Sequence, residues 1–272
     1  MKKLLSVLLM CVLAVTMVTA CGKKESTDKQ DKKGDTSFTK IQDKGVLKIG
    51  LCPEYPPFES VNTKGKVEGF DADLATAIGK EMGVKVEFVN TPWEGLISGL
   101  KNGEFDMIMS AMSPEEATSA TKEINMSDAY YVLNDVIAIK ADNKDITKKE
   151  DLAGKVIGFQ TGSAAEQGAD KLEKLGIKVG TKNPYNRNSD AFAELENGRI
   201  DAVIVSYPYA VTQSKEDKNF KVINDPIQGC DLVAISVKGT DSLTKEYNKA
   251  LKTLKDNGKY DDIVKKWLAV QE

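Results

Sequence analysis

The order of strands and helices constrains this chain most strongly, because the same alternation occurs twice. In the first half, apolar patterning predicts a strand over 45–52, a helix over 70–83, a strand over 84–90, a helix over 93–103 and a strand over 105–110. The second half repeats this order with a strand over 155–160, a helix over 164–176, a short strand over 177–180, a helix over 190–198 and a strand over 200–206. Such alternation is typical of parallel sheets covered by helices. The chain is therefore predicted to form two similar α/β lobes.

Two segments of the halves also match in their letters. GLKNGEFDMIMSA (99–111) and ELENGRIDAVIVS (194–206) both carry Leu-x-Asn-Gly, one further residue, an apolar residue, an aspartate and a buried strand. The match could equally reflect a common way of ending a helix, since Asn-Gly is a frequent helix stop. In open α/β sheets, ligands bind beyond the carboxyl ends of the strands. Those ends lie here at residues 52–55, 110–113, 160–163 and 206–207.

The chain is expected to cross between the lobes twice. Residues 132–142 could lead from the first lobe to the second, and the strand and helix after Pro226 have no counterpart in the second half, so they are expected to return to the first. The predicted boundaries are 38–134 with 230–272 for one lobe and 135–229 for the other. Two crossings make a hinge, and a hinge between two lobes makes a cleft that can close.

The segment SAMSPEEATSATKE (110–123) carries a helix-start pattern directly after the strand FDMIM. Ser113 can cap, Pro114 suits the first helical position and Glu116 can complete a capping box, so a helix is expected to begin here. A strand that ends at a helix N-terminus is a natural anion site. The segment contains no arginine, however, and its two glutamates oppose a full negative charge.

The N-terminus has the features of a secretory signal. Two lysines precede a short apolar run that ends in Val18-Thr19-Ala20-Cys21. This end resembles the lipobox of bacterial lipoproteins, in which the cysteine is acylated and becomes the mature N-terminus; the alternative is an ordinary cleaved signal with an incidental cysteine. Residues 1–20 are predicted to be the signal peptide. Residues 21–37 are predicted to be the lipidated Cys21 and a polar, disordered tether.

Composition excludes several classes of function. The formal net charge is −3 and the sequence pI is about 5.4, so no basic surface argues for nucleic-acid binding. The sequence has no histidine, and the thiols after the tether, Cys52 and Cys230, form no CxxC pattern, so neither a metal nor a cofactor is expected. The two thiols could pair in an oxidising compartment or stay free and buried. About 235 residues follow the tether, enough for two modest lobes.

Six segments in series resemble the bacterial extracellular solute-binding proteins of family 3, the polar amino-acid receptors of ABC importers. From about residue 40 to the C-terminus they are GLCPEYPPFE, EGFDADLATAIGKEMG, WEGLISGLKNGEFDMIMSAM, DLAGKVIGFQTGS, ENGRIDAVIV and ALKTLKDNGKYDDIVKKWL. The resemblance implies a two-lobed periplasmic-binding-protein fold of type II with a two-strand hinge. It also implies a lipid-anchored monomer on the extracytoplasmic face of the cell membrane, which closes on a small polar solute and delivers it to the permease.

The resemblance further implies where the pocket lies. Tyr55 and Trp93 fall where members place aromatic rings on either side of the ligand, although both could instead be core aromatics. Cys52 stands where many members carry an aspartate. The residues that match the segments meeting the ligand's carboxylate are Ser110, Ala111, Met112 and Ser113 in the first lobe and Gln160, Ser163 and Ala164 in the second.

Two charged groups of the family's pocket are missing from this sequence. Members that bind α-amino acids usually place an arginine in the turn after Ser113, where this chain has Ala117 or Thr118. They also place an aspartate for the ligand's ammonium at the end of the strand over 200–206, where this chain has Ser206. Losing both groups should remove ordinary recognition of a zwitterion. The ligand is therefore predicted not to be a standard α-amino acid.

A shifted alignment is the alternative to this loss. Lys122 or Arg187 could then hold the carboxylate, and Glu54 or Asp231 could hold the ammonium. The rest of the predicted wall consists of ring, hydroxyl, amide and thioether groups, and Tyr207 belongs to it. Such a wall suits a neutral polar solute, or a cation held over the rings with Glu54 nearby.

Binding is not the only function that this scaffold supports. Relatives with dehydratase activity exist, and they need a carboxylic acid placed for proton transfer, for which Glu54 and Glu166 are the candidates. The sequence offers no histidine for a catalytic triad and no glycine-rich phosphate loop, so we predict that the protein is not an enzyme. A stand-alone sensor is a third interpretation. A receptor returns its ligand unchanged, whereas an enzyme converts it.

Overall fold

The first of two large sheets is built from both ends of the described chain. The computed structural model describes residues 34–268, so the predicted signal peptide, Cys21 and most of the tether lie outside the described residues. The strand order is β5-β1-β6-β13-β7. These strands are β1 (Val46–Leu51), β5 (Lys85–Asn90), β6 (Met107–Ile108), β7 (Ile124–Met126) and β13 (Ile235–Val237). Strand β1 is parallel to β5 and β6, whereas β13 is antiparallel to its neighbours β6 and β7.

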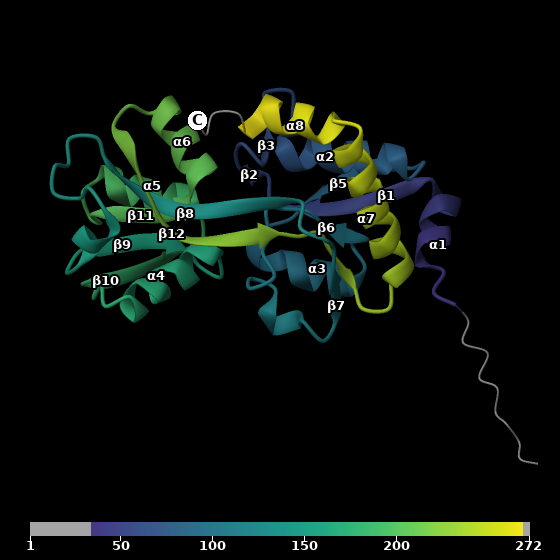
Figure 1. Ribbon diagram of the computed structural model, residues 1–272, viewed down its shortest axis with the longest axis horizontal. Coiled ribbons are helices and arrows are strands. Elements are labelled where there is room, and N and C mark those ends of the chain that lie inside the picture. Colours follow the sequence, from purple (N-terminus) through teal and green to yellow (C-terminus); the bar gives the residue numbers. More distant parts are fainter. Residues whose placement is uncertain (1–33, 269–272) are drawn as a thin grey trace, which may run out of the picture. The chain divides into compact units, whose positions relative to one another are not determined.

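Helices from both ends of the described chain cover this sheet (Figure 1). They are α1 (Ser37–Lys44), α2 (Phe70–Glu81), η1 (Trp93–Gly95), α3 (Leu96–Asn102), η2 (Thr118–Ala120), α7 (Asp241–Asp256) and α8 (Lys259–Leu268). In α2, Phe70, Leu74 and Ile78 recur every four residues and are fully buried, which is the apolar stripe of a core-facing helix. In α7, Tyr247 and Leu251 do the same. Both stripes pack into one core, so the C-terminal helices complete the first lobe.

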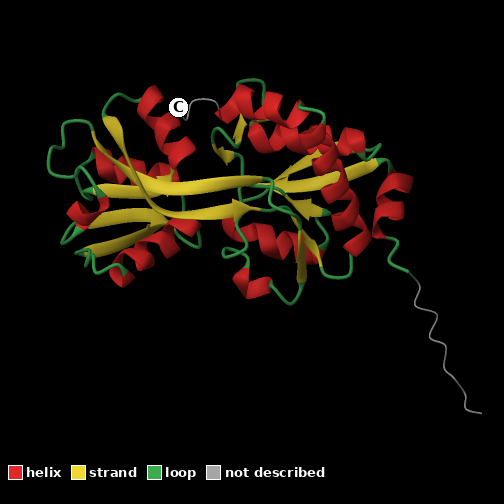
Figure 2. Ribbon diagram, viewed as in Figure 1, coloured by secondary structure: helices red, strands yellow, loops and turns green. Residues whose placement is uncertain are grey.

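The second large sheet has the strand order β10-β9-β11-β8-β12. Its strands are β8 (Tyr131–Lys140), β9 (Val156–Gln160), β10 (Thr181–Tyr185), β11 (Ala202–Ser206) and β12 (Phe220–Leu232). Strands β9, β10 and β11 are parallel, and β8 and β12 are antiparallel additions at one side. The helices around this sheet are η3 (Lys149–Leu152), α4 (Ala164–Lys174), α5 (Asn188–Glu196) and α6 (Tyr207–Glu216) (Figure 2).

The two long strands β8 and β12 join the sheets. They lie side by side and pair from Lys140 with Phe220 to Tyr131 with Leu232 (Figure 1). The register shifts between Ile223 and Gln228, and the irregular stretch accommodates Pro226, which has no N–H for a regular ladder. The predicted α/β fold, with two lobes joined by two strands, is thereby present. Strands β8 and β12 together form a two-stranded ribbon, and the predicted lobe boundaries fall inside it.

A small third sheet brings a carboxyl group toward the first large sheet. It consists of β2 (Glu54–Tyr55), β3 (Glu59–Val61) and β4 (Val67–Glu68). Gly69, with φ 133°, follows β4, and a Cβ there would lie 2.2 Å from the carbonyl oxygen of Phe58. Only glycine permits this approach, which lets Asp71 N donate to the Phe58 carbonyl at 2.9 Å. The start of α2 and the start of β3 are thus held together.

Two local predictions are wrong. No α-helix begins at Ser113: residues 114–117 form turns, followed by the short 3₁₀ helix η2. The hydroxyls of Thr118 and Thr121 bond to backbone carbonyls three residues earlier, and such side chains compete with helix formation. The strand predicted at 177–180 is also misplaced, since β10 begins at Thr181. Pro184 is tolerated within it because β10 is an edge strand.

Candidate functional site

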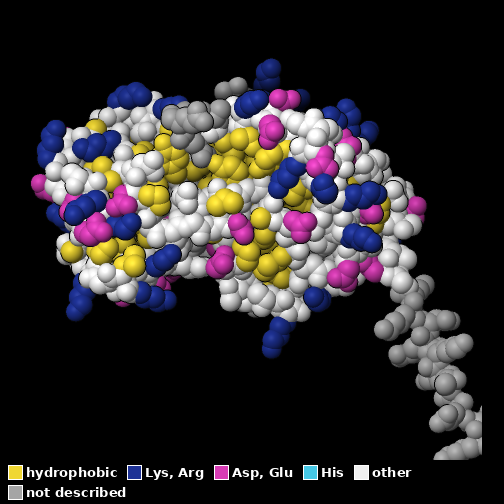
Figure 3. Space-filling model, in the orientation of Figure 1, with side chains coloured by type: hydrophobic (Ala, Val, Ile, Leu, Met, Phe, Trp, Pro, Cys, Tyr) yellow, Lys and Arg dark blue, Asp and Glu magenta, His cyan; other side chains and the backbone are white. Residues whose placement is uncertain are grey.

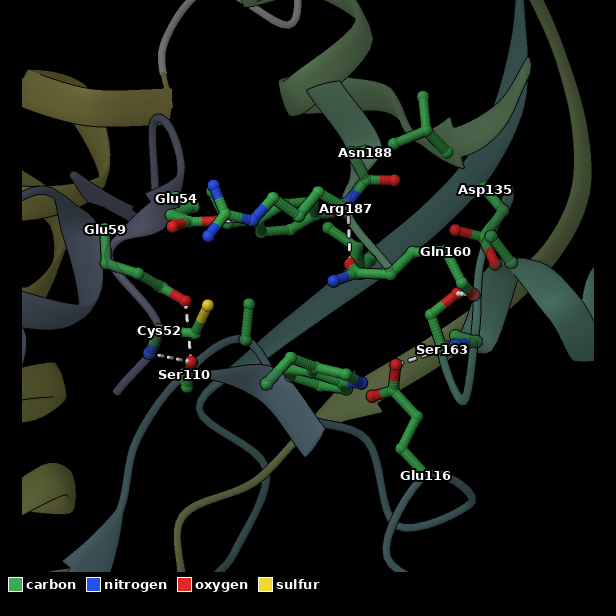
Figure 4. A pocket seen from close by; sticks show the side chains of 17 residues that line it. Cys52, Glu54, Glu59, Ser110, Glu116, Asp135, Gln160, Ser163, Arg187 and Asn188 are labelled. Carbon is green, nitrogen blue, oxygen red and sulfur yellow. Dashed lines mark hydrogen bonds and ion pairs between the residues drawn. The ribbon is translucent and has the colours of Figure 1, made fainter. Parts of the chain in front are cut away.

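A cavity lies at the carboxyl ends of strands from both large sheets (Figure 4). Most of the predicted ligand-binding residues line it: Cys52, Glu54, Tyr55, Trp93, Ser110, Ala111, Gln160, Ser163 and Ala164. The lining also includes residues that were not predicted, namely Glu59, Glu116, Leu133, Asp135, Ala165, Asn188 and Val205, and Arg187, which was considered only as a replacement.

Four of the predicted residues are absent from the cavity lining. Met112 is buried in the core, and its carbonyl accepts from Val233 N at 2.9 Å. Ser113 is fully buried. Ser206 is also buried, and its Oγ accepts from the Tyr55 hydroxyl at 2.5 Å. Tyr207 packs against the core of the second sheet. Ser113 and Ser206 therefore act next to the cavity, through the groups to which they bond.

Ser110 ties three segments of the first-lobe wall together. Its Oγ accepts from Cys52 N at 3.0 Å and donates to Glu59 Oε1 at 2.8 Å, as Figure 4 shows. The hydroxyl proton is thereby already used within the protein. Burial, with nearby carboxylates, raises the pKa of the Cys52 thiol to about 12, so this thiol is neutral. Cys52 and Cys230 are both free, so the structure does not form the disulfide that the sequence allowed.

Glu59 and Asp71 form a buried acid pair behind this wall. Asp71 Oδ2 accepts from Ala111 N at 2.6 Å and from the Tyr130 hydroxyl at 3.0 Å. The other oxygens, Glu59 Oε2 and Asp71 Oδ1, meet no N–H or O–H donor of residues 34–268, and the two carboxyl groups interact with each other. Burial raises the pKa of Asp71 to about 6 and that of Glu59 further, so Glu59 holds the proton that the pair shares.

Ala111 has a strained backbone at this point. Its φ of 46° lies in the left-handed region, which L-residues with a Cβ rarely adopt. The strain is held by the short hydrogen bond from Ala111 N to Asp71. The acid pair therefore sets the course of the chain where it leaves β6 and enters the cavity wall.

The turn after Ser113 contributes a carboxylate to the cavity. Glu116 Oε2 accepts from Ser113 N, and Glu116 Oε1 accepts from Ala164 N, both at 2.6 Å. Glu116 thus bridges the first-lobe turn and the first residue of α4, and Figure 4 shows it directed toward the Ser163 segment. Burial raises the pKa of Glu116 to about 7, although the two amide bonds act in the opposite direction.

Neither residue that replaces the family's arginine reaches the cavity. Ala117 is buried in the core and Thr118 is exposed. Lys122, the lysine considered as a substitute, is exposed and outside the cavity lining. Within this turn it is Glu116 that lines the cavity, so a negative group faces it where members usually place a positive one.

Asp135 supplies a second carboxylate from the ribbon. In the antiparallel pairing of β8 with β11, it lies opposite Ser206, the residue found where members carry an aspartate. Asp135 is only 2% exposed, and its Oδ2 accepts from Gln228 Nε2 at 3.0 Å. Burial raises its pKa to about 6. The one sequence signal for it was an aspartate within the apolar run VLNDVIAIK.

Arg187 is engaged at the edge of the cavity. Its Nε lies 3.2 Å from Glu54 Oε2, and both side chains are largely exposed. Gln160 is fixed beside it, because Asn188 Nδ2 donates to Gln160 Oε1 at 2.8 Å. The acidic side chains around the cavity thus outnumber the single guanidinium, and that guanidinium is already paired.

The predicted aromatic pair lines the cavity, but Tyr55 has further contacts. Its ring stacks on Tyr209 with centroids 4.8 Å apart, and its hydroxyl bonds to Ser206. Tyr55 therefore also links the small sheet to the second lobe. Trp93 is half-buried, which leaves ring surface for a ligand.

The part of the chain that the structure covers offers no metal centre. It contains no group of three or more Cys, Asp or Glu side chains arranged to hold a metal ion. Within residues 34–268, no helix is long and apolar enough to cross a bilayer.

Residues 47–270 match the bacterial extracellular solute-binding proteins, family 3. The chain is 33% identical over 270 residues to the arginine-binding extracellular protein ArtP of Bacillus subtilis (strain 168), covering 98% of each. It is 29% identical over 276 residues to the ABC transporter glutamine-binding protein GlnH of the same strain, again covering 98% of each. An ancestral amino-acid-binding protein, a precursor of cyclohexadienyl dehydratase, has a similar structure, with a TM-score of 0.75 at 34% identity, covering 85% of this chain and 99% of that one.

Proposed function

This chain belongs to the bacterial extracellular solute-binding proteins, family 3, and from that premise we propose that it is the lipid-anchored binding component of an ABC importer for a small polar solute. The family and the two-lobed type II fold predicted from the sequence are confirmed. The two Bacillus subtilis relatives are an arginine-binding protein and the glutamine-binding protein of an ABC transporter, which supports the expectation that this chain is a receptor rather than an enzyme.

The observation that carries the proposal is a cavity with walls from both lobes. Tyr55 and Trp93 stand on the first-lobe side, and Gln160, Ser163 and Ala164 on the second. A solute enclosed between them touches both lobes, so its binding favours the arrangement in which they approach. The ribbon of β8 and β12 supplies the connection about which they can move.

The proposed partners follow from the same scaffold. The solute is an amino acid or a similar compound, the receiving partner is a permease, and the membrane is reached through lipid on Cys21. We expect a monomer. Lysine and arginine side chains are scattered among acidic ones over the face in Figure 3, which gives no support for a nucleic-acid partner.

Thermal unfolding of the purified protein against a panel of solutes tests the proposal. The panel holds the L-amino acids, amines, amides, dipeptides and small heterocycles. A solute at about a thousand times its dissociation constant should stabilise the fold by about 4 kcal/mol, on the order of ten degrees. The bound solute should be recovered unchanged. Conversion of the solute would favour the dehydratase-like alternative. If no solute of the panel shifted the melting temperature, the proposal would be overturned.

The two tryptophans provide a matched control for that experiment. Trp93 lines the cavity, whereas Trp267 lies in α8, where its Nε1 bonds to Asp73. Trp93→Ala should lower the affinity for the bound solute about tenfold, because a ring face contributes about 1–2 kcal/mol. Trp267→Ala should leave the affinity unchanged. Equal effects of both substitutions would place the binding site elsewhere.

Lipidation is tested at Cys21. Cells grown with radiolabelled palmitate should label the wild-type protein, and the substitution Cys21→Ser should abolish the label, since the proposed lipid is attached through this thiol. Cys11→Ser is the matched control, because it changes a cysteine of the signal without touching the lipobox-like segment. Label retained in Cys21→Ser would exclude the proposed anchor.

A further inference from the structure

Two backbone amides in the cavity wall are already bonded to a carboxylate of the protein itself. Ser113 N belongs to the first-lobe segment that resembles the family's carboxylate-binding segment, and Ala164 N belongs to the matching loop of the second lobe. Both donate to Glu116 at 2.6 Å. A backbone amide has one proton to donate. While these bonds hold, a ligand carboxylate finds neither amide free.

The charged side chains around the cavity also disfavour the binding of a ligand carboxylate. Glu116 and Asp135 both line the cavity, and the charge of Asp135 adds to the rise in the pKa of Glu116. Arg187, the single cationic side chain of the lining, is bonded to Glu54 at the exposed edge. An incoming carboxylate would therefore meet like charge, whereas an incoming cation would meet the buried carboxylate of Asp135 and the half-buried one of Glu116.

Resting on the proposed function, we propose that the transported solute is an organic cation without a free α-carboxylate, whose ammonium or guanidinium group binds between Glu116 and Asp135. Its remaining body lies against the half-buried ring of Trp93, since a cationic or apolar group is favoured over an indole face. Glu116 takes the place that the ligand's own carboxylate has in an amino-acid receptor.

Matched pairs of solutes that differ only by the carboxylate test this proposal. Titration calorimetry at pH 8 compares agmatine with arginine, cadaverine with lysine and histamine with histidine. At least one amine should bind a hundredfold or more tightly than its parent amino acid. Parents that bind as well as their amines would overturn the inference. If no member of any pair binds, the inference also fails. In that case, a neutral solute that shifts the melting temperature would leave the proposed function standing. If no solute of the panel shifts it, both the proposed function and this inference fail.

Adjacent glutamates give the variant and its control. Glu116 lines the cavity, whereas Glu115 is exposed and outside the lining. Glu116→Gln should lower the affinity for the amine at least tenfold and narrow its preference over the parent amino acid. Glu115→Gln should change neither. Indistinguishable behaviour of the two variants, with circular dichroism showing both folded, would overturn the proposal.

The pH dependence of binding is a separate readout. The titratable groups around Glu116 are Asp135 on β8, Tyr55 on β2 and Cys230 on β12. Burial raises the pKa of Glu116 to about 7 and that of Asp135 to about 6, whereas it raises those of Tyr55 and Cys230 far above this range. A cation needs both carboxylates ionised, so its affinity should rise from pH 5.5 to pH 8, and Glu116→Gln should flatten this rise. Affinity that is constant over the interval would contradict the proposal.

Discussion

Replacement of Asp135 by asparagine is expected to lower the affinity for a cationic solute at least a hundredfold. The carboxylate is enclosed in the wall and held by Gln228, so it is already oriented toward a ligand. Loss of a hydrogen bond to a charged partner costs about 3 kcal/mol, which corresponds to about two decades in the dissociation constant. Asparagine has the same shape, and its carbonyl oxygen can still accept from Gln228. Titration calorimetry with the tightest-binding amine measures the effect.

Asp231→Asn is the control for that substitution. Asp231 lies on the same ribbon, pairs with Val132 and is exposed outside the cavity lining. Its replacement should leave the affinity within about twofold, since an exposed charge outside the cavity is screened by solvent and salt. If Asp135→Asn also stayed within that range, Asp135 would serve only the packing of the ribbon.

Replacement of Asp71 by alanine is expected to lower the free energy of unfolding by about 3–5 kcal/mol. The change leaves the Ala111 N–H and the Tyr130 hydroxyl without their acceptor, and it leaves Glu59 without its partner. Each buried polar group without a partner costs about 1–3 kcal/mol. Urea unfolding of the ligand-stripped protein at pH 7 measures the difference.

Glu59→Gln tests whether Glu59 is protonated, because glutamine is neutral and keeps the size of the side chain. A glutamine can accept from the Ser110 hydroxyl with its oxygen, and its neutral amide carries protons on the side where the protonated Glu59 faces Asp71. The variant should therefore unfold within about 1 kcal/mol of wild type. A loss as large as that of Asp71→Ala would show that Glu59 is ionised in the native protein.

The alternation of strands and helices could be predicted because it depends on local patterns. The spacing of Phe70, Leu74 and Ile78 marks a helix wherever it packs, and the apolar run of β1 marks a strand. Local patterns failed where two of them competed. The capping pair of Ser113 and Glu116 forms its hydrogen bonds, yet threonine side chains prevent the helix from continuing.

Glu54 was predicted in the site, but the carboxylates of Glu116 and Asp135 could not be, because their place depends on pairing between distant segments. The sequence places Ser206 where relatives have an aspartate, and the nearby carboxylate comes from Asp135, which is more than sixty residues earlier but opposite in the sheet. Glu116 could be assigned only to a cap. Glu116 also accepts from Ala164 N, and this contact depends on how the two lobes pack, which a local sequence pattern does not predict.

The position of β13 has a consequence for the order in which the chain can fold. This strand lies between β6 and β7 in the first sheet, although more than a hundred residues separate it from either. The second sheet, in contrast, is made from the continuous stretch between Tyr131 and Leu232. During synthesis and export the second lobe can therefore close its core while the first still waits for β13, α7 and α8. Contacts so distant in sequence form slowly. The lobe that starts the chain is expected to be completed last, and its incomplete sheet is the surface that is exposed to aggregation in the meantime.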